Sequence, residues 1–246
     1  MSSPNVYLFW DNSNIFISAK HVAARQEGLN AENFVRIHFE NLYRLAIANR
    51  PVAKAIAVGS IPREHEKLWQ SLKRDTGIEI ELYERGSISG GEQGVDQCLQ
   101  THMLRAIADE QSPQIAVLLT GDGKGYDDGV GFHADLERMH KNQWGIEVVS
   151  WELSCKRTLR EWASSIGEFV RLEDYYNAVT FLEGTRYSTP LNLVRRKCAH
   201  ITEIKRERAP EQELIALKKQ IKKLKYGQKI NNKASRSNKK KRKRGF

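Results

Sequence analysis

The chain has 246 residues, of which 40% are hydrophobic, so it can form one sizeable domain with an appendage and is not wholly disordered. No apolar run approaches the roughly 18 residues that a membrane span needs, and the start MSSPNVYLFWDN does not look like a leader peptide. We therefore expect no membrane association and a cytoplasmic protein, or a nuclear one if the organism is eukaryotic.

Charge is distributed unevenly along the chain. Residues 1–184 carry 19 Lys/Arg and 26 Asp/Glu, a net charge of −7, whereas residues 185–246 carry 21 and 4, a net charge of +17. An acidic body repels polyanions on average, so affinity for nucleic acid must come mainly from the C-terminal part. We divide the chain into a domain over 1–184, a helical extension over 185–227 and a disordered basic tail over 228–246.

Short apolar runs alternate with longer amphipathic segments in the first part of the chain. Strands are predicted over residues 5–10, 52–59, 78–83, 115–120, 146–151 and 168–171. Helices are predicted over residues 31–49, 63–76, 95–109, 132–142 and 156–165. Strands that alternate with helices, and that are apolar throughout, indicate an α/β fold with a parallel sheet covered on both faces.

The segment EQELIALKKQIKKLK after Pro210 predicts a short helix, over about 210–225. Its apolar residues recur at three-four-three spacing and form one stripe: Leu214, Leu217, Ile221 and Leu224. Two heptads are too few to establish a coiled coil, so the stripe either packs back on the domain or forms a homodimer.

Three cysteines, at positions 98, 155 and 198, are far apart and lie in no CxxC or CxxH arrangement. The seven histidines show no spacing typical of metal ligands. We expect buried free thiols and no zinc site.

Aspartates follow two of the predicted strands. Asp11 ends the first strand, and Asp122 lies just past the fourth. In a doubly wound sheet, ligands bind outside the carboxyl ends of the strands, where the winding direction reverses. If the first and fourth strands are neighbours, these two carboxylates face each other. Asp96 lies in the first turn of the helix predicted after a glycine-rich stretch, and it can approach them.

Three carboxylates in one small site repel one another, so a cation must offset their charge at neutral pH. Oxygen ligands without a nearby His or Cys select Mg²⁺ or Mn²⁺. Asn12 and Asn14 add amides that can position a ligand, a water molecule or a phosphate oxygen. Such cations serve phosphate chemistry, because they activate water and balance charge in the transition state.

Each of these aspartates also has a simpler structural interpretation. Residues 11–14 are typical of a turn in which Ser13 or Asn14 caps a helix. Asp96 can complement a helix dipole, and Asp122 can be an ordinary turn residue between two glycines. Two strand-end aspartates together with one at a helix start favour a site.

Together these motifs resemble the NYN domain family, a branch of the PIN-like metal-dependent ribonucleases. The resemblance covers about residues 5–175. It rests on three elements in the same order: the strand ending in Asp11 with Asn14, the Gly94-Val95-Asp96 entry into a helix, and the stretch Leu118 to Gly123 followed by a helix with Phe132.

The resemblance implies a three-layer α/β/α sandwich in which acidic residues bind Mg²⁺ or Mn²⁺ to hydrolyse phosphodiester bonds, usually in RNA. By this resemblance Asp11, Asp96 and Asp122 are metal ligands, and Asn14 and Thr120 support the site.

One departure from the family pattern affects the site. Where members often have a second aspartate two residues after the one matching Asp122, this chain has Lys124, followed by the apparent insertion KGYDDGVG. Asp127 or Asp128 can supply the missing acid, of which we take Asp128 as the metal ligand and Asp127 as its support; otherwise the metal site is incomplete. The same loop can equally be a mobile flap that binds substrate, since it contains three glycines.

These observations favour a metal-dependent endoribonuclease that acts on single-stranded RNA. Phosphate contacts are expected from Lys124 and from the uninterrupted basic run Lys239, Lys240, Lys241, Arg242, Lys243 and Arg244. The run can instead be a solvated tail or a nuclear localisation signal. A non-catalytic RNA-binding or scaffold protein is the alternative that Lys124 favours. A phosphatase with Asp11 as nucleophile is disfavoured, because Ser13 replaces the expected acid.

Overall fold

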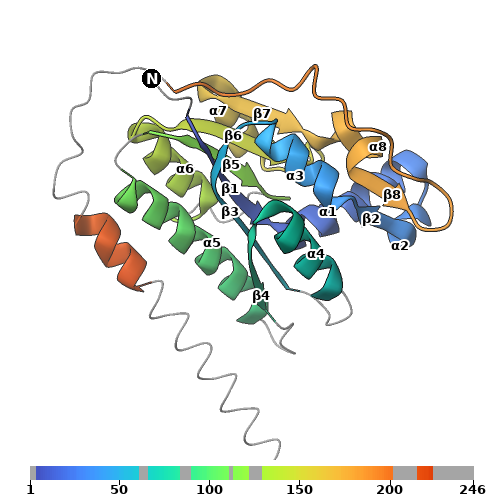
Figure 1. Ribbon diagram of the computed structural model, residues 1–246, viewed down its shortest axis with the longest axis horizontal. Coiled ribbons are helices and arrows are strands. Elements are labelled where there is room, and N and C mark those ends of the chain that lie inside the picture. The colour runs from blue at the N-terminus through green and yellow to red at the C-terminus, as the bar shows by residue number, and fades with distance from the viewer. Residues whose placement is uncertain are drawn as a thin grey trace, which may run out of the picture.

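A six-stranded sheet, parallel throughout, forms the centre of the molecule (Figure 1). The computed structural model describes residues 4–60, 66–83, 90–110, 113–121, 129–201 and 215–223. The order across the sheet is β4-β3-β1-β5-β6-β7. The strands are β1 (Val6–Asp11), β3 (Val52–Ser60), β4 (Glu79–Tyr83), β5 (Ile115–Leu119), β6 (Gly145–Ser150) and β7 (Glu168–Arg171).

β1 lies between β3 and β5, as the predicted site requires. Val6 is in register with Val52 on one side and Ile115 on the other. The chain winds outward in one direction from β1 through β3 to β4, and in the other from β5 through β6 to β7. The winding therefore reverses between β1 and β5. These are the first and fourth predicted strands, so the adjacency that the predicted site assumed is present.

Helices cover both faces of the sheet. Val6, Leu8 and Trp10 of β1 point into one buried cluster, whereas Tyr7 and Phe9 point into another. The first cluster lies under α1 (Asn12–Glu27), α3 (Phe39–Ile47) and α4 (Glu66–Thr76), and the second under α5 (Gly90–Asp109), α6 (Phe132–Lys141) and α7 (Arg157–Ile166). The predicted α/β/α sandwich is therefore confirmed.

The segment between β1 and β3 differs from the prediction. Residues 12–27 form α1, for which we predicted no helix, and the predicted helix over 31–49 is divided into α2 (Ala31–Phe34), β2 (Val35–Ile37) and α3. β2 pairs antiparallel with β8 (Thr180–Leu182) in a separate two-stranded sheet. This partner is more than 140 residues away in the sequence, so tertiary pairing overrides the local helical pattern.

The chain after β7 continues to pack on the domain. It forms a 3₁₀ helix, η2 (Leu172–Tyr175), then α8 (Tyr176–Val179) and β8. Residues 187–201, within the predicted helical extension, form neither helix nor strand. This strap runs past the amino ends of the strands, where the backbone N–H of Ala199 and the guanidinium of Arg196 both donate to Glu147 near the start of β6 (Figure 1, orange).

A short helix over residues 215–223 lies beside α5 (Figure 1). Leu217 and Ile221 are 5% and 9% exposed and belong to the same buried cluster as the inner side chains of α5 and α6. This part of the apolar stripe packs on the domain. A homodimer, the exact domain limits and the disordered tail stay predictions. Within the residues that the structure describes, no helix is long and apolar enough to cross a membrane.

Candidate functional site

Asp11 is the last residue of β1 and also the N-cap of α1. Its backbone is extended, with φ −86° and ψ 94°, and its side chain accepts the backbone N–H of Asn14 at 3.2 Å. The side-chain amide of Asn14 donates to the other carboxylate oxygen at 2.5 Å. Asp11 is 0% exposed. The carboxylate is therefore held rigidly at the carboxyl end of the central strand, and the capping residue is Asp11 rather than the predicted Ser13 or Asn14.

Two oxygen atoms beside Asp11 are buried without a hydrogen bond. The side-chain carbonyl of Asn12 and the hydroxyl of Thr120 have no partner among the described residues. Thr120 follows β5 directly and is 0% exposed. Buried polar atoms normally have partners, so these two oxygens indicate a place for a group that the described residues do not supply, such as an ordered water molecule or a cation.

Gly121 fixes where the chain leaves β5. A Cβ atom at this position would lie 2.0 Å from the backbone oxygen of Asn14, so only glycine permits this contact between the end of β5 and α1. The carbonyl of Gly121 accepts hydrogen bonds from the hydroxyls of Ser150 and Ser154. The residue immediately before Asp122 is thus anchored against the first turn of α1.

Asp96 lies in the second turn of α5, because this helix begins at Gly90 rather than at the predicted residue 95. It shares a helix face with Leu99 and Met103, which are buried against the sheet, yet Asp96 itself is exposed. α5 runs back from the carboxyl edge of the sheet and contacts β1 and β3. Asp96 therefore lies near the open edge, as its predicted role requires.

The side chains of Asp11, Thr120 and Asp96 lie in the same layer of the sandwich. Successive strand residues alternate between the two faces, and Phe9 and Leu118 point into the cluster under α5. Asp11 and Thr120, each two residues further on, fall on that same face. The structure thus brings three of the predicted site residues to one edge and one side of the sheet.

The other predicted site residues lie outside the described residues. These are Asp122, Lys124, Asp127, Asp128, Lys239, Lys240, Lys241, Arg242, Lys243 and Arg244. Their roles stay predictions.

Asp135, in the first turn of α6, was not among the predicted site residues. It is 1% exposed and accepts a hydrogen bond from Arg138 at 2.9 Å. Burial raises the pKa of its carboxyl to about 7, although Arg138 opposes this. His133 and His140 pack against Trp162 of α7, so Asp135, about 200° around the helix from His133, faces α5. The signal in the sequence was the Asp–Arg pair at i, i+3 within an otherwise buried turn.

The donor atoms at this edge suit a hard divalent cation. Asp11 and Asp96 offer carboxylate oxygens, and Asn12 and Thr120 offer an amide and a hydroxyl oxygen. These four residues supply oxygen donors only, which Mg²⁺ and Mn²⁺ prefer. The buried oxygens without partners are what such a group would satisfy, directly or through water.

A comparison with protein-family models matches residues 5–176 to the NYN domain. The chain belongs to the NYN domain family. NYN domains are part of the PIN-like nuclease superfamily, whose members generally use divalent metal ions. The match spans every strand of the central sheet and includes Asp11, Asp96 and Thr120. No curated protein and no solved structure matches the chain. The family match thus indicates a fold of the PIN-like nuclease superfamily. The site described above lies at the carboxyl ends of β1 and β5 in this fold.

Proposed function

We propose that this NYN protein is a metal-dependent endoribonuclease that cleaves single-stranded RNA. The observation that carries this proposal is the buried Asp11 carboxylate, oriented by Asn14 at the switch point between β1 and β5, beside two buried oxygens without partners among the described residues. In this proposal Asp11, Asp96 and Asp122 hold Mg²⁺ or Mn²⁺, with Asp128 as the fourth ligand and Asp127 in support.

When bound, the cation supplies an activated water molecule and balances the charge that develops on the phosphate. The residues of this chain have separate tasks. Asn14 fixes the plane of the Asp11 carboxylate through two hydrogen bonds. Thr120 and Asn12 orient water or phosphate oxygens at the buried side of the site. Burial of Asp11 at the strand end keeps bulk water from screening its charge.

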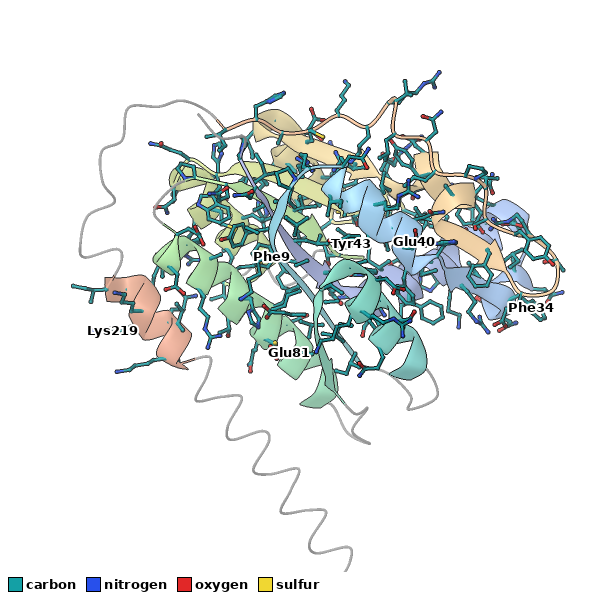
Figure 2. All side chains as sticks on the ribbon, viewed as in Figure 1. Phe9, Phe34, Glu40, Tyr43, Glu81 and Lys219 are labelled. Carbon is teal, nitrogen blue, oxygen red and sulfur yellow. The ribbon has the colours of Figure 1, made fainter. Side chains whose placement is uncertain are left out.

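Basic residues outside the sheet favour the proposal that the substrate is RNA. The helix over 215–223 turns Leu217 and Ile221 inward and leaves four lysines exposed: Lys218, Lys219, Lys222 and Lys223. Lys219 points away from the domain in Figure 2. These lysines precede the basic run 239–244, so one continuous cationic segment follows an acidic domain. Such a segment binds phosphates with an affinity that falls steeply with salt.

Cleavage of a labelled circular RNA tests this function directly, because only an endonuclease can open a circle. The full chain is incubated with Mg²⁺, Mn²⁺ or a chelator, and we expect metal-dependent opening. Asp96→Asn should abolish it. Asp109→Asn, which removes an exposed carboxylate from the far end of the same helix, is the matched control and should cleave normally.

Binding without cleavage, across both metals and several RNA sequences, would contradict the proposal and favour the non-catalytic alternative that Lys124 suggests. Deletion of residues 228–246 should weaken RNA binding, most strongly at low salt, and leave metal-dependent cleavage in place. Loss of metal binding on this deletion would contradict the division of roles between domain and tail.

A further inference from the structure

A second group of metal-ligating atoms lies on the outer flank of α5. Glu81 of the edge strand β4 accepts hydrogen bonds from the thiol of Cys98 at 3.0 Å and from Nε2 of His102 at 2.8 Å. Its two carboxylate oxygens each serve one of these partners. One ligand atom from each of the three residues lies within 4.8 Å of the other two. Glu81 is labelled beside α5 in Figure 2.

Two regular elements build this group. Cys98 and His102 are four residues apart, so they lie on the same face of α5. Glu81 lies on β4, in register with Val58 of β3, which is in register with Asp11. Strand spacing therefore sets Glu81 about 10 Å from Asp11, measured across two strands. Both carboxylate oxygens of Glu81 are engaged by Cys98 and His102, so Glu81 belongs to a group distinct from Asp11.

The burial of the three side chains suits a site with one open side. Cys98 is 2% exposed and His102 is 7% exposed, whereas 43% of the Glu81 side chain is exposed. The thiol and imidazole are thus shielded from bulk water, and the carboxylate faces it. Solvent or a small fourth ligand can approach from the side of Glu81.

The chemistry of these donors differs from that of the Asp11 site. One thiol, one imidazole and one carboxylate are the ligand types of zinc, which takes three protein ligands and one open position in many sites. Zn–N and Zn–O bonds of about 2.0 Å and Zn–S bonds of about 2.3 Å place tetrahedral ligand atoms roughly 3.3–3.6 Å apart. The contacts of 2.8 Å and 3.0 Å, each to a different oxygen of Glu81, are a few tenths of an ångström shorter than this spacing. All three ligand atoms lie within 4.8 Å of one another, so side-chain adjustments of about an ångström bring them to a zinc ion.

The imidazole is able to release its Nε2 proton toward a cation. The other ring nitrogen of His102, Nδ1, is buried and has no hydrogen-bond partner in the described ranges. No acceptor there fixes the tautomer, so the proton can move to Nδ1 and leave the Nε2 lone pair for a metal.

We propose that Glu81, Cys98 and His102 bind one zinc ion, in a site separate from the Asp11 cluster. This proposal departs from the expectation, drawn from the sequence, that the chain has no zinc site. Binding releases the thiol proton of Cys98 to solvent, and a water molecule completes the tetrahedron without any change of oxidation state. The Cys98 thiolate and the Glu81 carboxylate offset the two charges of the ion. Zinc then joins the edge strand β4 to α5, the helix that also carries Asp96.

Arg105 is the nearby group that opposes this binding. Its positive charge acts on Glu81 and lies one turn beyond His102 on α5. Arg105→Gln should therefore tighten zinc binding several-fold, whereas the same change at Arg74, an exposed arginine on α4, should not.

The test measures zinc binding rather than RNA cleavage, so it is independent of the proposed function. The full chain is freed of metal with a chelator and titrated with Zn²⁺ against a chromophoric chelator, and with Co²⁺ as a spectroscopic substitute. We expect a sulfur-to-cobalt charge-transfer band that saturates at one ion per chain, whereas an ion at the Asp11 cluster gives no sulfur band. Zinc should also raise the thermal midpoint of the chain, since it binds the folded state.

A double variant that keeps Cys98 and removes the other two thiols tests whether Cys98 is the sulfur ligand. The chain has three cysteines, so Cys155→Ser with Cys198→Ser leaves Cys98 as the single thiol, and this variant should keep the cobalt band. Cys98→Ser and His102→Gln should each weaken zinc binding at least tenfold. Asp11→Asn should leave the sulfur-to-cobalt band unchanged, because Asp11 lies outside this group. Absence of a sulfur band in the wild type, or its loss in the double variant, would overturn the proposal.

Discussion

Asn14 donates two hydrogen bonds to Asp11, one from its backbone and one from its side chain, and thereby joins a helix cap to a candidate metal ligand. The same carboxylate starts α1 and closes the central strand. Its two tasks differ in what they require. The cap needs only an acceptor oxygen, whereas the carboxylate also supplies negative charge that offsets the charge of a divalent cation.

Substitutions at Asp11 should separate these tasks. Asparagine caps helices as well as aspartate does, so Asp11→Asn should keep the free energy of unfolding within about 0.5 kcal/mol of wild type while reducing cleavage by about 100-fold or more. Asp11→Ala should lose cleavage and also about 1 kcal/mol of stability. Urea unfolding and RNA cleavage of both variants check this. Equal losses of stability in the two variants would contradict the capping role.

Thr120→Val should reduce cleavage about tenfold or more without loss of stability, because the hydroxyl has no hydrogen-bond partner among the described residues. Thr180→Val is the matched control. The hydroxyl of Thr180 is equally buried but donates to the carbonyl of Tyr176 at 2.6 Å, so its loss should cost about 1 kcal/mol and leave cleavage intact. If Thr120→Val destabilises the protein as Thr180→Val does, the Thr120 hydroxyl has a structural role instead.

Arg196→Met should lower the free energy of unfolding by about 3–5 kcal/mol. Glu147 is fully buried between Arg50 and Arg196, and removal of one partner leaves its charge poorly compensated. Arg171→Met, which breaks exposed ion pairs with Glu152 and Asp174, should cost less than about 1 kcal/mol. Urea titrations of the full chain measure both. Similar small losses would show that the strap contributes little to stability.

Asp135 predicts a pH dependence of stability with a definite sign. Its folded pKa of about 7 lies above the ordinary value of 3.8, so the folded state binds this proton more tightly than the unfolded state does. Stability from this group is fully present below about pH 4 and is lost as the pH rises through 7. The stability difference between wild type and Asp135→Asn should therefore fall by about 1 kcal/mol per pH unit from 5 to 7, and level off above 8. A difference that is constant across this range would contradict the raised pKa.

The sheet could be predicted because its strands are buried on both faces. β1 and β5 are apolar at nearly every position, and this pattern can be recognised without knowing which strands lie beside them. Each predicted strand begins and ends within about a residue of the observed one. α1 escaped prediction because Ile17, 37% exposed, and Phe16 flank its buried stripe of Ile15, Ala19 and Val22 and blur the helical period.

The two sites also differ in whether local sequence patterns or only tertiary contacts reveal them. Asp11 and Thr120 could be placed because strand ends of a parallel sheet converge on one edge. The contact of Glu81 with Cys98 and His102 could not be predicted, because β4 and α5 are separated in the sequence and no local pattern indicates that these side chains meet. The Cys98–His102 spacing of four residues was visible in the sequence, but two ligands on one helix face predict no third.

The central place of β1 also constrains how the chain folds. β1 precedes both of its partners in the chain. It pairs on one side with β3 and on the other with β5, whose Ile115 lies over 100 residues beyond its partner Val6. Such long-range pairing is slow, because a large loop must close before its contacts form. Until β5 pairs with it, apolar β1 has one unpaired edge that can form hydrogen bonds with a strand of another chain. Refolding should therefore be sensitive to protein concentration, and β1 is the segment where we expect aggregation to begin.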